Sequence, residues 1–274
     1  VRFALLAPGS TAPQRQQSYR CKDFNGLEHA VRHYLAENED PPVQAAAFDV
    51  ATAITGDFIR LTNSPWAFSI EQTRRQLALD QLLVVNDFTA LALSIPTLAE
   101  AELRTVGHGS AIADAPIALI GPGTGLGVSG LFRTHDNWLA IEGEGGHAAF
   151  SPMDEREDAV LGVLRERHGH VSNERLLSGP GLVAIYESLC RLDHVAVLGM
   201  TPERVTELGL AEENLHCAEA LDMFCAALGT AAANLAVTLG ARGGVYIGGG
   251  IVPQLGDYFA RSRFRTRFEH KGRF

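Results

Sequence analysis

The sequence has little cysteine, and its cysteines are widely spaced. Its four cysteines form no Cys-x-x-Cys pair; they are Cys21, Cys190, Cys217 and Cys225. This spacing fits neither a zinc site nor the disulfide framework of a small secreted protein. We therefore expect a protein of a reducing compartment, the cytoplasm.

Excess positive charge and long apolar runs are also lacking. The chain has 23 basic and 32 acidic residues, a formal net charge of −9, with no basic block to offset it. This balance disfavours nucleic acid or an anionic membrane as the main partner. No run of about 18 apolar residues is free of polar interruption, so no membrane span is predicted. We expect partners of neither kind.

The chain has enough hydrophobic residues to form a sizeable core. The chain has 274 residues, 46% of them hydrophobic, enough for one large soluble domain or two ordinary ones. Periodicity and turn signals predict an α/β protein. The expected strands cover 1–6, 43–52, 58–61, 82–85, 117–120 and 128–132, and the expected helices cover 27–35, 70–79, 88–95, 155–167, 181–192 and 217–239. A further strand leads into the glycine turn at 248–250, and another helix follows it. The helix over 217–239 is apolar nearly all round and should be central and buried.

Two further features concern how these elements connect. Gly56-Asp57 predicts a hairpin between the strands 43–52 and 58–61, and Ser69 with Gln72 predicts a capping box for the next helix. Glycines and polar residues between 96 and 115 suggest a boundary between two halves.

The apolar strand 82–85 ends in an amide and a carboxylate, Asn86 and Asp87. Ligands of open α/β sheets gather at the carboxyl ends of strands, so Asp87 is a candidate catalytic base. The alternative is structural, because Asp is also a good N-cap for the helix expected to follow.

Glycine-rich turns form a second group of candidates. The loop 121–127 joins two apolar strands, and its glycines allow backbone N–H groups to face a phosphate, with Thr124 adding a hydroxyl. It matches neither G-x-G-x-x-G nor a P-loop, and a plain tight hairpin is the alternative. The turns at 179–181 and 248–250 are either simple element ends or places that present amides and open space to a nucleotide.

Carboxylates and an imidazole supply polar candidates. Glu144 and His147 lie among glycines in 142–147, where they could bind a metal or a polar ligand. No further spaced His or Cys completes a metal set, so hydrogen bonding to hydroxyls is favoured. Glu174 alone is typical of a surface carboxylate paired with an arginine, and we assign no role to His168 or His170.

Taken together and in order, these segments resemble the bacterial glucokinase family, a branch of the sugar-kinase, Hsp70 and actin superfamily. The similarity extends over essentially the whole chain. It rests on the following segments: 54–57, 62–63, 66–69, 86–90, 123–127, 143–147, 174–175, 178–181, 244–253 and 268–274.

The resemblance implies a two-domain, actin-like (ribonuclease H-like) α/β sugar kinase with a cleft between a domain of residues 1–97 and one of residues 98–274. It implies ATP-dependent phosphorylation of the glucose 6-hydroxyl, with Mg²⁺ as the cation, no protein metal ligands assigned, and a homodimer. Asp87 would be the base. The implied glucose-binding residues are Asn86, Asp87, Glu144, His147 and Glu174. The implied ATP-binding residues are Gly123, Thr124, Gly125, Gly179, Gly181, Gly248, Gly249 and Gly250.

The sequence also departs from the family. The family's opening phosphate loop, Gly-Asp-x-Gly-Gly-Thr-Asn, and its final strand and helix are absent, so we expect the printed sequence to be part of a longer chain. A genuine fragment that transfers phosphate poorly is the alternative. Two other functions stay open, a kinase for another hexose and a non-catalytic sugar-binding regulator. The lack of a helix-turn-helix and of a basic face argues against a repressor.

Overall fold

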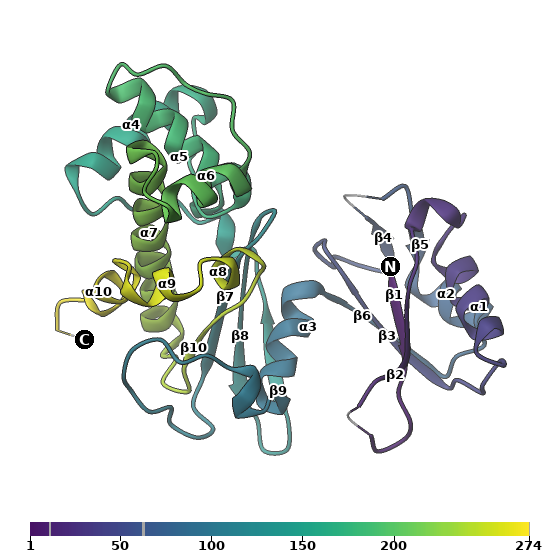
Figure 1. The fold of residues 1–274 in the computed structure, drawn as a ribbon. Helices are drawn as coiled ribbons and strands as arrows, with labels where there is room; N and C mark the ends of the chain where they lie inside the picture. Colours follow the sequence, from purple (N-terminus) through teal and green to yellow (C-terminus); the bar gives the residue numbers. More distant parts are fainter. Residues whose placement is uncertain (11, 62–63, 274) are drawn as a thin grey trace. The chain divides into compact units, whose positions relative to one another are not determined.

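The computed structural model describes residues 1–10, 12–61 and 64–273. The chain divides into two compact units, residues 1–90 and 91–274, so the division falls within helix α3 (Asp87–Ser94). Figure 1 shows the elements of both units. The domain boundary at 97/98 stays a prediction. Of the segments that carry the family resemblance, 62–63 and residue 274 lie outside the described residues.

The first unit combines short strand pairs with two helices. Strand β1 pairs antiparallel with β2, β3 pairs parallel with β6, and β4 pairs antiparallel with β5. Phe3, Tyr34 and Trp66 are buried at its centre. The elements are β1 (Arg2–Leu5), β2 (Gln14–Ser18), α1 (Leu27–Glu37), β3 (Ala45–Val50), β4 (Phe58–Arg60), β5 (Ala67–Ser69), α2 (Ile70–Gln76) and β6 (Gln81–Asn86).

The hairpin expected between 43–52 and 58–61 is wrong. Strand β3 pairs with β6, and β4 pairs with β5, with Phe58 opposite Ser69. The carboxylate of Asp57 explains the difference, since it accepts hydrogen bonds from the Ser69 hydroxyl and from the backbone N–H of Glu71, the latter at 2.8 Å. These bonds tie the segment before β4 to the start of α2 instead of turning it back onto β3.

Helix α2 has the predicted Ser69 cap but is shorter than expected. The Ser69 hydroxyl accepts a hydrogen bond from the backbone N–H of Gln72 at 3.0 Å. The helix ends at Gln76 because Ala78 has a left-handed conformation, with φ of 53°, and Leu79 N–H bonds back to the carbonyl of Arg74.

The second unit contains a four-stranded sheet in the order β10-β7-β8-β9 (Figure 1). Strands β7 and β8 form the predicted hairpin, β9 adds to β8 antiparallel, and β10 pairs parallel with β7. The sequence analysis did not predict β9, whose residues are half-buried or exposed. The strands are β7 (Ile117–Pro122), β8 (Leu126–Arg133), β9 (Trp138–Glu142) and β10 (Val245–Ile247).

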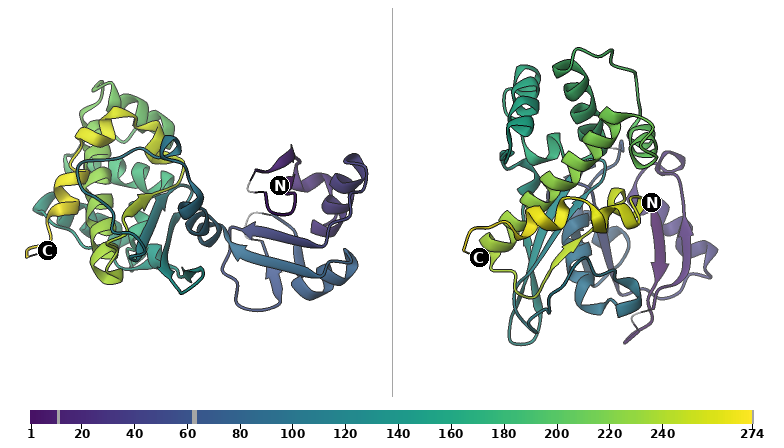
Figure 2. Two further views of the ribbon diagram at one scale, coloured as in Figure 1. Left: turned by 90° about the horizontal axis from the view of Figure 1, so that it is seen from below. Right: turned by 60° about the vertical axis from the view of Figure 1, so that its left-hand side comes forward.

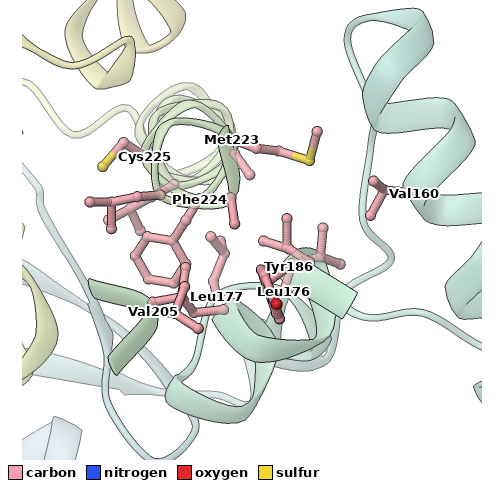
Figure 3. Close-up of a cluster of buried hydrophobic side chains, with 14 of the residues drawn as sticks. Val160, Leu176, Leu177, Tyr186, Val205, Met223, Phe224 and Cys225 are labelled. Atoms are coloured by element: carbon pink, nitrogen blue, oxygen red, sulfur yellow. The ribbon is translucent and has the colours of Figure 1, made fainter. Parts of the chain in front are cut away.

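Helices beyond the turn of this hairpin enclose the main core. Helix α7 passes through it, with α10 packed against α7 (Figure 2). Phe224, Tyr186 and Leu177 fill the space between α7 and the neighbouring helices (Figure 3). The helices are α4 (Glu155–His168), α5 (Gly179–Leu192), α6 (Pro202–Leu210), α7 (Leu215–Leu239), α8 (Ile251–Gln254), α9 (Asp257–Arg261) and α10 (Phe264–Glu269).

Helix α7 confirms the central buried helix expected from the sequence. It is long and apolar enough to cross a membrane, but 72% of its most apolar 18-residue window is buried inside this unit. Gly240 ends it in a left-handed conformation, with its N–H donating to the carbonyl of Ala236. Its apolarity is therefore that of a core helix.

Candidate active site

The end of β6 fixes the amide of Asn86. Its side-chain oxygen accepts a hydrogen bond from the backbone N–H of Phe88 at 2.9 Å, at the first turn of α3. Its side-chain nitrogen donates to the carbonyl of Thr52, just beyond β3, at 3.3 Å. Asn86 therefore holds the start of α3 and the end of β3 in register.

Asp87 follows directly and is half-buried. One carboxylate oxygen, Oδ1, accepts a hydrogen bond from the Phe88 N–H at 2.9 Å. Burial raises the pKa of Asp87 above its ordinary value, the Phe88 N–H opposes this, and the charge of Asp49 on β3 raises the pKa further. The alternative that Asp87 caps α3 is wrong, because the helix begins at Asp87 and the side-chain oxygen of Asn86 accepts the N–H groups of Phe88 and Thr89. Sequence reasoning gave no signal for Asp49.

The glycine loop 121–127 is a tight β-hairpin. Pro122 and Leu126 form its last strand pair, leaving Gly123, Thr124 and Gly125 at the tip. The Gly123 N–H donates to the carbonyl of Gly125 at 2.8 Å, which closes the turn. Thr124 is exposed at the tip, where its hydroxyl is accessible.

Glu174 contacts this hairpin. Its Oε2 accepts a hydrogen bond from the backbone N–H of Leu126 at 3.0 Å. A Cβ at 125 would lie 2.5 Å from the same Oε2, so a side chain there would displace the Glu174 carboxylate. The Ser178 hydroxyl donates to the backbone carbonyl of Glu174 at 2.8 Å and accepts from Gly181 N–H at 3.1 Å, which caps α5. The hairpin, Glu174 and the start of α5 are thus one connected structure.

The other two glycine turns also meet the hairpin strands. Gly179 N–H donates to the carbonyl of Gly123 at 2.9 Å, and Gly248 N–H donates to the carbonyl of Ile120 at 2.9 Å. Gly249 has φ of 79° and its Cα faces the carbonyl of Pro122 so closely that a Cβ would overlap it. The three predicted nucleotide segments therefore lie together.

Glu144 and His147 lie at the surface of this unit. Their side chains are 62% and 61% exposed, and His147 Nε2 is 3.9 Å from a Glu144 carboxylate oxygen. Gly146 between them is packed against the carbonyl of Leu126, so a side chain there is excluded. Both groups are therefore available to a ligand.

Backbone pairing joins this segment to the one that carries Glu174. The Asn173 N–H donates to the carbonyl of Ala148 at 2.8 Å. A ring nitrogen of His170 lies 3.1 Å from the carbonyl of His147. His170, which sequence reasoning left without a role, thus contacts the turn that carries His147.

The predicted site residues fall into two groups. Asn86 and Asp87 belong to the unit of residues 1–90, and the remaining residues belong to the unit of residues 91–274, where the structure brings them around the β7–β8 hairpin. Within the described residues, no group of three or more His, Cys, Asp or Glu side chains is arranged to hold a metal ion.

Comparisons with solved structures define the class. The chain aligns with the crystal structure of a glucokinase from an Antarctic psychrotroph with a TM-score of 0.91 and 33% identity, covering 99% of this chain and 86% of the other. A ROK family glucokinase from Streptomyces griseus in complex with glucose and AMPPNP shares the fold, with a TM-score of 0.55 and 16% identity over 88% of this chain and 78% of that one. The fold is that of the actin-like sugar kinases.

Sequence comparisons define the family. The family model described as Glucokinase matches residues 1–274. The Glucokinase of Chromobacterium violaceum is 54% identical over 274 residues, which is 100% of this chain and 78% of that protein. The chain belongs to the glucokinase family.

Proposed function

We propose that this chain transfers the γ-phosphoryl group of ATP to the 6-hydroxyl of glucose, giving glucose 6-phosphate and ADP. Membership of the glucokinase family over residues 1–274 is the observation that carries this function. The connected hairpin and glycine turns support it, since phosphoryl transfer depends on positioning and charge stabilisation more than on covalent chemistry. In a cell, this reaction is the first step of glycolysis.

Glucose recognition is assigned to neutral and acidic hydrogen-bonding groups. The sugar has no charge, so its hydroxyls are distinguished by donors and acceptors, which amide, carboxylate and imidazole groups supply. The exposed side chains of Glu144 and His147 support this role, as does the proximity of their segment to Glu174. Asn86 is assigned to the sugar as well, although both ends of its amide already have backbone partners.

ATP is assigned to the hairpin and the two glycine turns. At the tip, Thr124 offers its hydroxyl and the backbone to the phosphates. Gly179 and Gly181 at the start of α5 and Gly248–Gly250 after β10 are assigned to the adenosine side. Because no group of three or more acidic, His or Cys side chains among the described residues is arranged to hold a metal, an Mg²⁺ would enter with ATP, held mainly by substrate phosphates and waters. Bound in this way, Mg²⁺ would supply positive charge to the phosphates.

Asp87 is assigned as the general base. Its carboxylate accepts the proton of the glucose 6-hydroxyl while the sugar oxygen forms its bond to the γ-phosphorus and the bond to the ADP oxygen breaks. A half-buried carboxylate with a raised pKa is a stronger proton acceptor than a solvated one, which supports the assignment. The Phe88 N–H on Oδ1 orients the carboxylate and leaves its other oxygen, Oδ2, for the hydroxyl.

A sugar panel tests the proposal. Purified full-length protein with Mg²⁺-ATP should release ADP with glucose far faster than with mannose, fructose or N-acetylglucosamine. A preference for another sugar would favour a different hexose kinase. Glucose binding in calorimetry without ADP release would favour a non-catalytic regulator.

Compartment and assembly are also proposals. All four cysteines are free thiols, which supports a cytoplasmic protein. Homodimerisation is supported by the family resemblance alone, and sedimentation of the purified protein tests it.

A further inference from the structure

We infer that Glu174 is a positioning residue that couples sugar binding to nucleotide binding, with one carboxylate oxygen for each site. The inference rests on the proposed function, because it takes Glu174 as a glucose contact and the hairpin as the phosphate site. It goes beyond that function by assigning Oε2 to the hairpin and Oε1 to the sugar.

The first observation is that Oε2 of Glu174 accepts a hydrogen bond from the hairpin. It accepts the Leu126 N–H at 3.0 Å, and this N–H belongs to the residue that closes the tip on the β8 side. Gly125 leaves the space that Oε2 occupies, since a Cβ there would be 2.5 Å away. The side chain therefore contacts the tip at two consecutive residues.

The second observation is that a hydrogen bond to its carbonyl fixes the backbone of Glu174. Its carbonyl accepts the Ser178 hydroxyl at 2.8 Å, and that hydroxyl also caps α5. One step further along, Gly179 N–H binds the carbonyl of Gly123 on the opposite side of the tip, at 2.9 Å. Glu174 and Gly179 thus hold the two sides of the tip, and a shift of one is transmitted to the other.

The coupling follows from the shared carboxylate. A sugar hydroxyl on Oε1 restricts rotation of the Glu174 side chain, and this keeps Oε2 on the Leu126 N–H and the tip in its closed geometry. The nucleotide then binds a hairpin that the sugar has already ordered, so its binding loses less conformational entropy. This is positive coupling between the two sites. Coupling of this kind is reciprocal, so nucleotide must tighten sugar binding by the same factor.

Calorimetry on the full-length protein measures this factor directly. The dissociation constant for glucose is determined with and without saturating AMPPNP, and the ratio of the two is the coupling factor. We expect a factor of about five or more for the unaltered protein. In Glu174→Gln, glucose affinity should fall and the ratio should approach one, because the amide no longer provides two equivalent acceptor oxygens. Glu187→Gln removes one charge from a partly exposed carboxylate paired with Arg167 and should keep the ratio of the unaltered protein.

A second variant changes the contact from the hairpin side and keeps the carboxylate. Gly125→Ala places a methyl group against Oε2 and should also reduce the ratio. Gly162→Ala is the control substitution, since Gly162 lies in α4 outside the proposed binding residues and a Cβ there meets no atom within 4 Å, and it should keep the ratio. If Glu174→Gln does not fold, this pair decides the matter.

The outcomes separate the inference from the proposed function. Weaker glucose binding in Glu174→Gln with an undiminished ratio would overturn the coupling and leave the sugar contact intact. Unchanged glucose affinity in Glu174→Gln would overturn the sugar contact. A ratio of one in the unaltered protein, or the same ratio in Gly125→Ala and Gly162→Ala, would overturn the coupling.

Discussion

The side-chain oxygen of Asn86 lies 2.9 Å from the backbone nitrogen of Phe88 and accepts its hydrogen bond, so the residue before the candidate base also begins the helix that follows it. The end of β6 therefore carries both the cap of α3 and the candidate base. A substitution at Asn86 acts on stability as well as on the substrate, and the two effects have to be measured separately.

Asn86→Ala should lower the free energy of unfolding by about 1 kcal/mol, the usual cost of losing an N-cap side chain. Asn86→Ser keeps a capping oxygen and should lose less. Urea denaturation of both variants measures the difference. Equal stability of Asn86→Ala and the unaltered protein would show that the Asn86 bonds to Phe88 and Thr52 contribute nothing.

The acid limb of the pH–rate profile should report Asp87. Protonated Asp87 cannot accept the hydroxyl proton, so kcat/KM is lost as the pH falls through a pKa that is raised above the ordinary Asp value, mainly by burial and in part by Asp49. Removing the Asp49 charge in Asp49→Asn lowers the pKa of Asp87 and should move the limb to lower pH.

Position 80 provides the control for this shift. Asp80 is exposed at the opposite end of β6, roughly 20 Å from Asp87 by the rise of a strand, and beyond the screening length of physiological salt. Asp80→Asn removes the same charge and should leave the limb in place. If Asp49→Asn and Asp80→Asn have the same profile, the Asp49 charge does not act on the base.

Gly249→Ala should destabilise the second unit, because it forces a side chain into a left-handed conformation with φ of 79° and against the carbonyl of Pro122. The backbone strain alone costs about 1–2 kcal/mol. The KM for ATP should rise as well, since Pro122 carries the hairpin tip. Thermal denaturation and initial rates measure the two effects.

The neighbouring glycine makes this a matched comparison. A Cβ at Gly250 meets nothing within 4 Å, so Gly250→Ala should melt like the unaltered protein. The packing of Gly249 would have no energetic role if the two variants melted at one temperature.

Local patterns in the sequence predicted many single helices and strands, but they did not predict which strands pair with each other. The apolar run before Asn86 forms β6, the glycine loop forms the β7–β8 hairpin, and the alanine-rich segment forms α7, because each pattern lies within one element. The pairing of β3 with β6 was missed because it is decided by residues more than 30 positions apart, and by Asp57 binding the start of α2.

The candidate site was also predictable in its single residues but not in the contacts between them. Residue types at strand ends and in glycine turns marked Asp87, Gly123 and Gly249 as candidates. The bond from Leu126 to Glu174 spans 48 positions and uses a backbone N–H, which no residue type reveals. The influence of Asp49 on Asp87 likewise arises only when β3 and β6 lie side by side.

The rate of glucose 6-phosphate formation by Asp87→Asn, measured with Mg²⁺-ATP and saturating glucose, tests the central claim most directly. We predict that the unaltered protein forms the product and that the variant is slower by about 10²–10⁴-fold, the contribution of a general base. Equal rates for the two proteins, or no product from the unaltered protein, would contradict the account.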